Sequence, residues 1–382
     1  MTTKTNNNIH NLVKKKLGNL PIWDLSDLYH STESIEITTD LKFIEKKANL
    51  FEKKYEGKIN SLNGESILSA IEELEIIDER ISKILSFAHL LYAENIEDEK
   101  NKIFFQQIQE KITKFSSSLI FFTLELNSIE KDQINKLFNT KGLKKFKTWI
   151  EIVRAYKPYQ LNKKLEKLMK DKSVTSSAAW IRLFDQTIAS LRFPYKKKQL
   201  SSAEILIYFT DKNSSKRKEA AKSVGKVLKN NANIFSTITN TLAKDKAVND
   251  EWRGYPNPVR SRNLANVVED EVVEALSKAI TSSYSKLSHR YYKMKAKWFG
   301  KKSLKYWDRN APLPFQNNRF YNWKEATSIV LEAFNNFNSD MGKIAQMFFD
   351  ERWIHAPVIK GKSPGAFSAS TVPSVHPYIL LN

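Results

Sequence analysis

The chain has 382 residues, of which 41% are hydrophobic and 12% aromatic, and its 62 Lys and Arg against 42 Asp and Glu give a formal net charge of +20. This apolar content excludes a disordered chain, and the length allows two or three compact domains. The sequence has no cysteine, which excludes disulfides, cysteine-ligated zinc and thiol nucleophiles.

The excess of basic residues permits a polyanionic partner without requiring one. Lys and Arg are spread along the chain, and the tightest runs are only three residues long, at 14–16 and 196–198. A dedicated nucleic-acid surface usually concentrates them among aromatic side chains. The spacing therefore favours a solvated basic surface over a nucleic-acid partner.

No stretch of the sequence approaches the length and apolar character of a membrane-spanning helix. The first twenty residues also lack the apolar core of a signal peptide. Together with the absence of cysteine, these features lead us to expect a cytoplasmic protein with no membrane partner.

The first half of the chain has the apolar spacing of long helices. Over residues 67–91 apolar side chains recur every three or four positions, which predicts one long helix whose start is marked by Asn63 and Gly64. The segment 105–126 alternates spacings of three and four, a pattern typical of a helix-bundle seam. We expect this second segment to pack against the first.

The composition changes around residues 193–213, where a Lys run is followed by a typical helix start at Ser201 to Glu204. We place a domain boundary there, with an N-terminal helical domain at 1–195 and a second domain at 196–382. Three more helices are predicted in the second domain, at 276–298, 323–337 and 339–350.

The last thirty residues differ from all that precedes them. Apolar residues lead into a turn at 360–365, and a second apolar run follows Pro373. This pattern predicts short strands joined by turns. The predicted fold class is therefore mainly α, a bundle of long helices with a few short β-strands near the C-terminus.

Complete catalytic motifs are missing. The six histidines stand at positions 10, 30, 89, 289, 355 and 376, so the smallest gap between two of them is twenty residues. An H-E-x-x-H zinc helix needs two histidines four residues apart, so that both imidazoles leave one face. Phosphate-binding glycine motifs and the G-x-S-x-G elbow are also absent. We expect no catalytic residue and no metal ligand within this chain.

Several short segments together resemble one family. They are 21–29 (PIWDLSDLY), 157–161 (KPYQL), 178–180 (AAW), 183–185 (LFD), 306–313 (YWDRNAPL), 362–368 (KSPGAFS) and 371–382 (TVPSVHPYILLN). The sequences of these segments and their order along the chain resemble oligoendopeptidase F, in the thimet-oligopeptidase family of zinc metallopeptidases. Tyr159 departs from the His expected at its position. The resemblance covers the whole chain but only about the first two thirds of a family member, ending before the H-E-x-x-H helix.

The resemblance implies a zincin-type oligopeptidase that hydrolyses short peptides with a zinc ion. It also implies that a strand before the zinc helix holds the substrate by backbone hydrogen bonds. Gly365, Ala366, Phe367 and Ser368 match that strand, and a substrate-binding role is expected for them. His376 precedes the zinc motif in the family pattern, so we interpret it as a structural or supporting group and not as a ligand.

Three hypotheses follow. The first is the N-terminal part of a truncated, split or incompletely recorded oligopeptidase, inactive alone because the zinc ligands and general base are absent. The second is a free-standing basic helical protein that binds an acidic or nucleic-acid partner. The third is complementation by a separate C-terminal chain that carries the zinc helix. Without the helices that follow in the family, residues 372–381 are expected to expose apolar surface and unpaired strand edges.

Overall fold

The computed structural model describes residues 17–315, 319 and 321–381. His10, the basic run at 14–16 and Asn382 lie outside the described residues. The first half of the chain forms α2 (Ile35–Tyr55), η1 (Ile59–Ser61), α3 (Gly64–Glu94), α4 (Glu99–Ser117), α5 (Ile120–Ser128), α6 (Lys131–Leu137), η2 (Leu143–Phe146), α7 (Lys147–Arg154), η3 (Lys157–Tyr159), α8 (Lys163–Lys172) and α9 (Ser177–Ser190).

The second half begins with a small hairpin and ends in a small sheet, with helices between them. Its elements are β1 (Phe193–Tyr195), β2 (Lys198–Leu200), α10 (Ser202–Ile207), η4 (Tyr208–Thr210), α11 (Ser214–Asn230), α12 (Ala232–Arg253), α13 (Arg260–Ala265), α14 (Asp270–Ser283), α15 (Ser288–Trp298), η5 (Tyr306–Asp308), α16 (Trp323–Phe337), α17 (Ser339–Asp350), β3 (Ile354–His355), β4 (Phe367–Ala369) and β5 (Tyr378–Leu380). The predicted fold class is confirmed. None of the described helices is long and apolar enough to cross a membrane.

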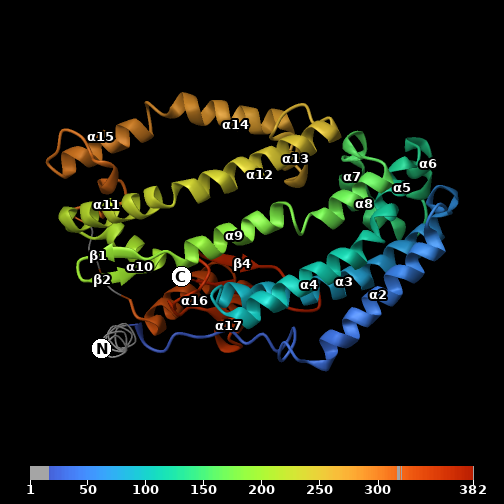
Figure 1. Ribbon diagram of the computed structural model, residues 1–382, viewed down its shortest axis with the longest axis horizontal. Helices are drawn as coiled ribbons and strands as arrows, with labels where there is room; N and C mark the ends of the chain where they lie inside the picture. Colours follow the sequence, from blue (N-terminus) through green and yellow to red (C-terminus); the bar gives the residue numbers. More distant parts are fainter. Residues whose placement is uncertain (1–16, 316–318, 320, 382) are drawn as a thin grey trace.

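The long helix α3 is the centre of the main core. The stripe predicted over 67–91 faces inward, and Ile67, Ile84 and Ala88 are completely buried. The predicted start is also correct, because the Asn63 side chain accepts a hydrogen bond from the Ser66 N–H at 2.9 Å. Helices α2 and α4 pack on α3, as Figure 1 shows. The bundle therefore forms as the apolar periodicity predicts.

Two predicted long helices are each divided in two. The segment 105–126 breaks between α4 and α5, where the Ser116 and Ser117 hydroxyls donate to carbonyls one turn earlier. The segment 276–298 breaks between α14 and α15, where Ser282 and Ser283 make the same kind of bond to Ala279. Side chains that bond to backbone carbonyls compete with the helical pattern, and each break lies just after such a pair of serines.

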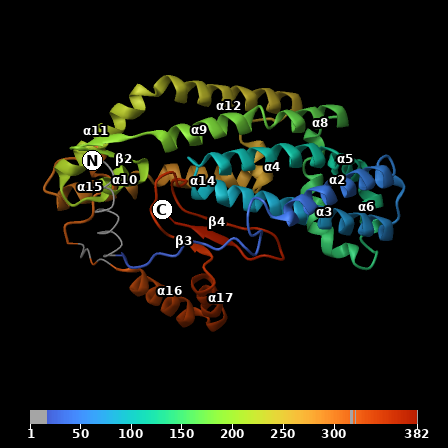
Figure 2. The same cartoon turned by 60° about the horizontal axis from the view of Figure 1, so that its bottom comes forward.

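The helices stack in layers along the molecule. Helices α9 and α12 run side by side above the layer of α3 and α4, and the pair α16 and α17 projects from the opposite side (Figure 2). The capping box of Ser201 and Glu204 starts α10 as predicted. The helices predicted at 323–337 and 339–350 are confirmed as α16 and α17.

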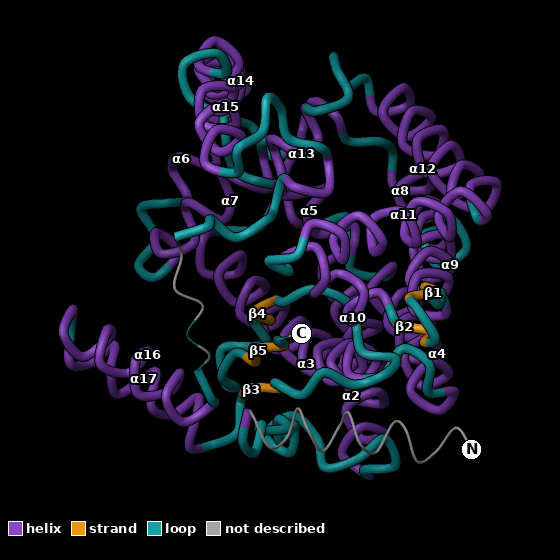
Figure 3. The backbone as a smooth tube through the Cα atoms, turned by 90° about the vertical axis from the view of Figure 1, so that its left-hand side faces the viewer, coloured by secondary structure: helices purple, strands orange, loops and turns teal. Residues whose placement is uncertain are grey.

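The C-terminal strands form a three-stranded sheet in the order β3-β5-β4, seen near the centre of Figure 3. Strand β5 is parallel to β3 and antiparallel to β4. The expectation of an exposed tail is wrong, because Tyr378 and Leu380 are completely buried and Val372 is 6% exposed. Residues of the tail pack on the N-terminal bundle, in the same core as Trp23. The larger exposed apolar faces lie on α14 to α17 instead.

Candidate functional site

Strand β4 and the turn before it carry the four residues expected to bind substrate, and β4 lies at an edge of the sheet. Gly365 precedes the strand with φ of +89°, a backbone conformation that favours glycine. Gly365, Ala366 and Ser368 are exposed, whereas the half-buried Phe367 points toward the bundle, with its ring centroid 5.8 Å from that of His89 on α3. The structure therefore places all four residues on one accessible strand and its turn.

The free edge of β4 presents the backbone groups of Ser368. The Ile379 N–H donates to the carbonyl of Trp353, just before β3, and the Leu381 N–H donates to the carbonyl of His355 in β3. Because backbone groups alternate sides along a strand, the intervening Leu380 faces β4, where it is paired with Phe367. The next residue, Ser368, then directs its N–H and C=O away from β5. Among the described residues, β4 pairs with no strand other than β5.

A buried ammonium holds the turn before β4 against the sheet. Lys362 is 6% exposed, and its Nζ donates to the carbonyls of His355, Pro357 and Leu381. Burial lowers the pKa of Lys362 to about 8, and the nearby Glu94 carboxylate opposes this effect. One side chain thus joins the ends of β3 and β5 to the turn that leads into β4.

His355 lies in the core beside this lysine. The imidazole is completely buried, its Nε2 is 3.7 Å from Glu94 Oε1, and neither ring nitrogen has a hydrogen-bond partner among the described residues. The Trp23 indole N–H donates to Glu94 Oε2 at 3.0 Å. Burial would raise the pKa of Glu94, but the neighbouring His355 and Trp23 hold it below its usual value. These groups form a packed polar cluster under the sheet.

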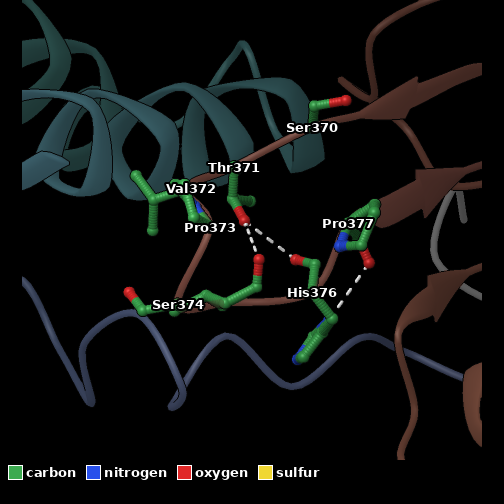
Figure 4. Close-up of a pocket in the computed structure, with 8 residues that line it drawn as sticks. Ser370, Thr371, Val372, Pro373, Ser374, His376 and Pro377 are labelled. Atoms are coloured by element: carbon green, nitrogen blue, oxygen red, sulfur yellow. Dashed lines mark hydrogen bonds between the residues drawn. The ribbon is translucent and has the colours of Figure 1, made fainter. Parts of the chain in front are cut away.

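His376 lies in the loop that lines a surface cavity of about 500 Å³, formed by residues 370–377 (Figure 4). The Thr371 hydroxyl fixes the loop through contacts with the carbonyls of Val375 and His376, at 2.6 and 2.9 Å. The His376 ring stacks on Trp353, with 3.6 Å between centroids, and its Nε2 is 2.9 Å from Asp27 Oδ2. His376 therefore connects the tail to the N-terminal segment.

The first and last motifs of the sequence meet in space. Asp24 N–H donates to the Arg352 carbonyl, and Ala356 N–H donates to the Pro21 carbonyl, both at 2.9 Å. An ion pair between Arg352 and Asp24 adds to this contact. The sequence predicted no role for Asp24, Glu94 or Lys362. The partners of Asp24 and Glu94 are distant in sequence, and no motif marks Lys362 as the donor to its three carbonyls. The only sequence signal was that Asp24 and Lys362 lie within the quoted motifs.

The described residues do not fit a zinc site. No group of three or more His, Asp and Glu side chains converges within 17–315, 319 and 321–381. The two tail histidines have different surroundings, since His355 is enclosed in the core and His376 is stacked on Trp353. A metal-dependent reaction would therefore need ligands that these residues do not supply.

A second cavity of about 500 Å³ lies between the two predicted domains. It is lined by α5, α7 and α8 on one side and by α12 on the other. The Arg253 guanidinium of α12 forms a bidentate ion pair with Glu166 of α8, at 2.7 and 2.8 Å. Tyr159, at the position where the family pattern has His, stacks on Tyr255 with 4.4 Å between centroids. The two predicted domains therefore contact each other closely.

Comparisons with known proteins agree with the resemblance to oligoendopeptidase F that the motifs indicate. The profile of the family described as Oligopeptidase F matches residues 125–193. An oligoendopeptidase F homolog from Lactococcus lactis is 25% identical over 373 residues, which cover 94% of this chain and 60% of the relative. Oligopeptidase PepF from Bacillus subtilis is 22% identical over 340 residues, which cover 86% of this chain and 50% of the relative.

Solved structures show the same fold. Oligoendopeptidase-F from Enterococcus faecium superposes with a TM-score of 0.67 at 18% identity, over 83% of this chain and 60% of that one. PZ peptidase A, solved with an inhibitor, gives a TM-score of 0.70 at 15% identity, over 92% of this chain and 60% of that one. The chain thus spans no more than about 60% of the length of these relatives.

Proposed function

The chain is related to the oligoendopeptidase F peptidases, as its motifs indicate, and from this premise we propose that residues 1–382 form part of a cytoplasmic, zinc-dependent oligopeptidase. Its substrates in the intact enzyme are short peptides. Residues 1–195 are the N-terminal helical domain and residues 196–382 are the first part of the peptidase domain.

The observation that carries this proposal is the free edge of β4. An extended peptide adds to an exposed strand edge through backbone hydrogen bonds, and this mode of binding tolerates many sequences. Gly365, Ala366, Phe367 and Ser368 supply that edge in our proposal, and Ser368 directs its N–H and C=O toward the peptide. Phe367 and Lys362 support the strand from below.

We propose further that these residues do not hydrolyse peptides alone. Peptide hydrolysis by a zinc peptidase needs the metal ligands and a carboxylate that accepts the proton of the attacking water. The donor groups described above do not converge in that way. A chain that carries an H-E-x-x-H helix is the partner that this proposal implies. We propose that such a chain packs on the exposed apolar side chains of the segment from α14 to α17, which include Leu276, Leu287, Phe337 and Ile344.

Peptide binding tests the role of β4. Replacing Ser368 by Pro removes the outward N–H and leaves the paired face of the strand intact, because proline is tolerated at a strand edge. We expect short fluorescein-labelled peptides to bind Ser368→Pro about 2- to 10-fold more weakly, the equivalent of one hydrogen bond of about 0.5–1.5 kcal/mol. The matched control Ser368→Ala keeps the backbone donor and should bind as the parent does. Equal binding by all three proteins would refute the edge assignment.

Measurements of metal content and of peptide cleavage test the proposal that the chain does not hydrolyse peptides alone. The purified chain should hold no stoichiometric zinc and should not cleave internally quenched fluorescent peptides. EDTA-sensitive cleavage by the chain alone would show that a metal site exists which the described residues do not reveal. Peptide binding by β4 is measured separately, so the two parts of the proposal fail independently.

A further inference from the structure

We infer that one end of the molecule, built from residues 193–230 and 286–309, binds single-stranded nucleic acid. These two segments are named here the basic end. In Figure 1 they form the left end of the molecule, where β1, β2, α11 and α15 lie. This inference is independent of the peptidase proposal.

Charge is the first argument. Residues 193–230 hold ten Lys and Arg against three Asp and Glu, and residues 286–309 hold nine against Asp308 alone. The basic end therefore carries +15 of the net charge of +20, while the rest of the chain carries only +5. A codon usage that favours lysine would raise the number of basic residues along the whole chain. It therefore does not explain why the excess positive charge lies in these two segments.

The fold brings the two segments together. The Arg217 guanidinium of α11 donates to Asp308 of η5 at 2.6 Å, and the Ser214 hydroxyl is 3.2 Å from the same oxygen. The Lys218 ammonium lies 5.6 Å from the centroid of the Trp307 ring. Residues separated by about ninety positions in the sequence are thus in direct contact, and the two segments lie at the same end of the molecule.

The acidic groups of the basic end are mostly occupied. Asp308 is completely buried between Arg217 and Lys301, and Asp211 pairs with Lys216. Glu204 forms the capping box of α10, which leaves Glu219 as the one exposed carboxylate of these two segments. The exposed basic residues without an ion pair to any described residue are Lys196, Lys197, Lys198, Lys212, Lys218, Lys222, Lys226, Lys229, Lys286, Arg290, Lys293, Lys297, Lys302, Lys305 and Arg309.

Exposed aromatic rings lie among these lysines. Tyr306 is 67% exposed and next to Trp307, and Tyr291 and Trp298 are 44% and 39% exposed on α15. Proteins that bind single strands combine a positive surface, which follows the phosphates, with aromatic rings on which unpaired bases stack. Paired bases in a duplex do not offer those faces. The combination of lysines and exposed rings therefore favours a single strand over a duplex.

Binding to a fluorescein-labelled oligo(dT) tests the inference. We expect a Kd on the order of micromolar near physiological salt, as is usual for binding without sequence specificity. The triple variant Lys218→Gln, Lys302→Gln and Lys305→Gln should bind at least about 10-fold more weakly. Loss of three phosphate contacts should also lower the slope of log K against log salt by about 2.

A matched triple variant controls for net charge. Lys42, Lys46 and Lys53 are exposed on α2, which extends toward the opposite end of the molecule in Figure 1. Replacing these three by Gln removes the same charge and should leave binding nearly unchanged. Equal weakening by both triple variants would overturn the inference, because binding would then follow total charge. Melting curves of both variants confirm that they fold.

The aromatic contribution needs its own variant. Tyr306→Ser should weaken binding of the single strand about 5- to 100-fold without changing the salt slope, because stacking does not release counterions. A duplex of the same length should bind more weakly than the single strand. Tighter duplex binding, or binding only to anionic phospholipid vesicles and not to oligo(dT), would overturn the assignment to single-stranded nucleic acid.

Discussion

The buried carboxylate of Asp308 allows a direct test of what stabilises the packing of α11 against η5. Asp308 has no exposed surface, and it accepts hydrogen bonds from Arg217 and Lys301 at 2.6 Å each. Arg217 is itself only 1% exposed, and it also donates to the carbonyls of Asp211 and Lys212. The substitution Asp308→Asn keeps the shape of the side chain and removes its charge.

The expected cost follows from the burial of the remaining cation. Asparagine leaves the Arg217 guanidinium buried without a counter-ion, and breaking one side of a buried pair costs about 3–5 kcal/mol. Exposed pairs contribute about 0–1 kcal/mol. The matched control Asp340→Asn breaks the pair with Lys343, in which both side chains are more than 70% exposed, and should change stability by less than about 0.5 kcal/mol.

Urea unfolding followed by tryptophan fluorescence measures both effects. The double variant Arg217→Met with Asp308→Leu should recover most of the loss, because a packed apolar pair replaces a buried ion pair at little cost. If Asp308→Asn is no less stable than Asp340→Asn, the buried pair does not stabilise the domain, and this reasoning is wrong.

The same site predicts a dependence on pH. Burial alone would raise the pKa of Asp308, but hydrogen bonds from Lys301 and Arg217 lower it to about 2 from the ordinary value of 3.8. Between these two values the unfolded chain binds a proton that the folded chain does not, so stability falls as pH decreases. The stabilisation by Asp308 should be complete above about pH 4 and disappear as pH falls toward 2. The wild-type protein should therefore lose more stability than Asp308→Asn across that interval.

Two other substitutions give further predictions for the same unfolding assay. Lys362→Met removes the donor to three carbonyls and should cost about 1–3 kcal/mol at pH 7. This difference should grow above pH 8, because the unfolded chain then keeps a proton that buried Lys362 has released; a constant difference up to pH 10 would contradict the buried ammonium. Tyr378→Phe removes a buried hydroxyl that has no partner among the described residues, so stability should be unchanged or higher, whereas Tyr378→Ala should cost about 3–5 kcal/mol. A large loss in Tyr378→Phe would show that the hydroxyl does have a partner.

The sequence predicted the helices well where one apolar stripe faced one core. The stripe of α3 is a local pattern, and burial of Ile67, Ile84 and Ala88 follows directly from its spacing. The breaks after α4 and α14 were not predicted, because the apolar spacing continues through them. There the serine hydroxyls compete with the helix for backbone carbonyls, and that competition is decided by local geometry.

The candidate site was only partly predictable. The resemblance marked Gly365 to Ser368, and the short strands of the tail were expected. The sequence did not show that β4 is an edge strand, that Lys362 is buried beneath it, or that β5 is central and its apolar residues covered. Strand order and pairing depend on contacts between distant segments, so they follow from the fold and not from any single segment.

The sequence by itself determined the helical fold class, the buried face of α3 and the relationship of the chain to the oligoendopeptidase F peptidases. Each of these depends on local spacing or on short motifs. Only the tertiary structure decided which surfaces are exposed and where charge gathers. His376 of the last motif contacts Asp27 of the first, and Arg217 and Asp308 join the basic segments 193–230 and 286–309. Contacts between distant residues create such surfaces, and these contacts exist only after the chain has folded.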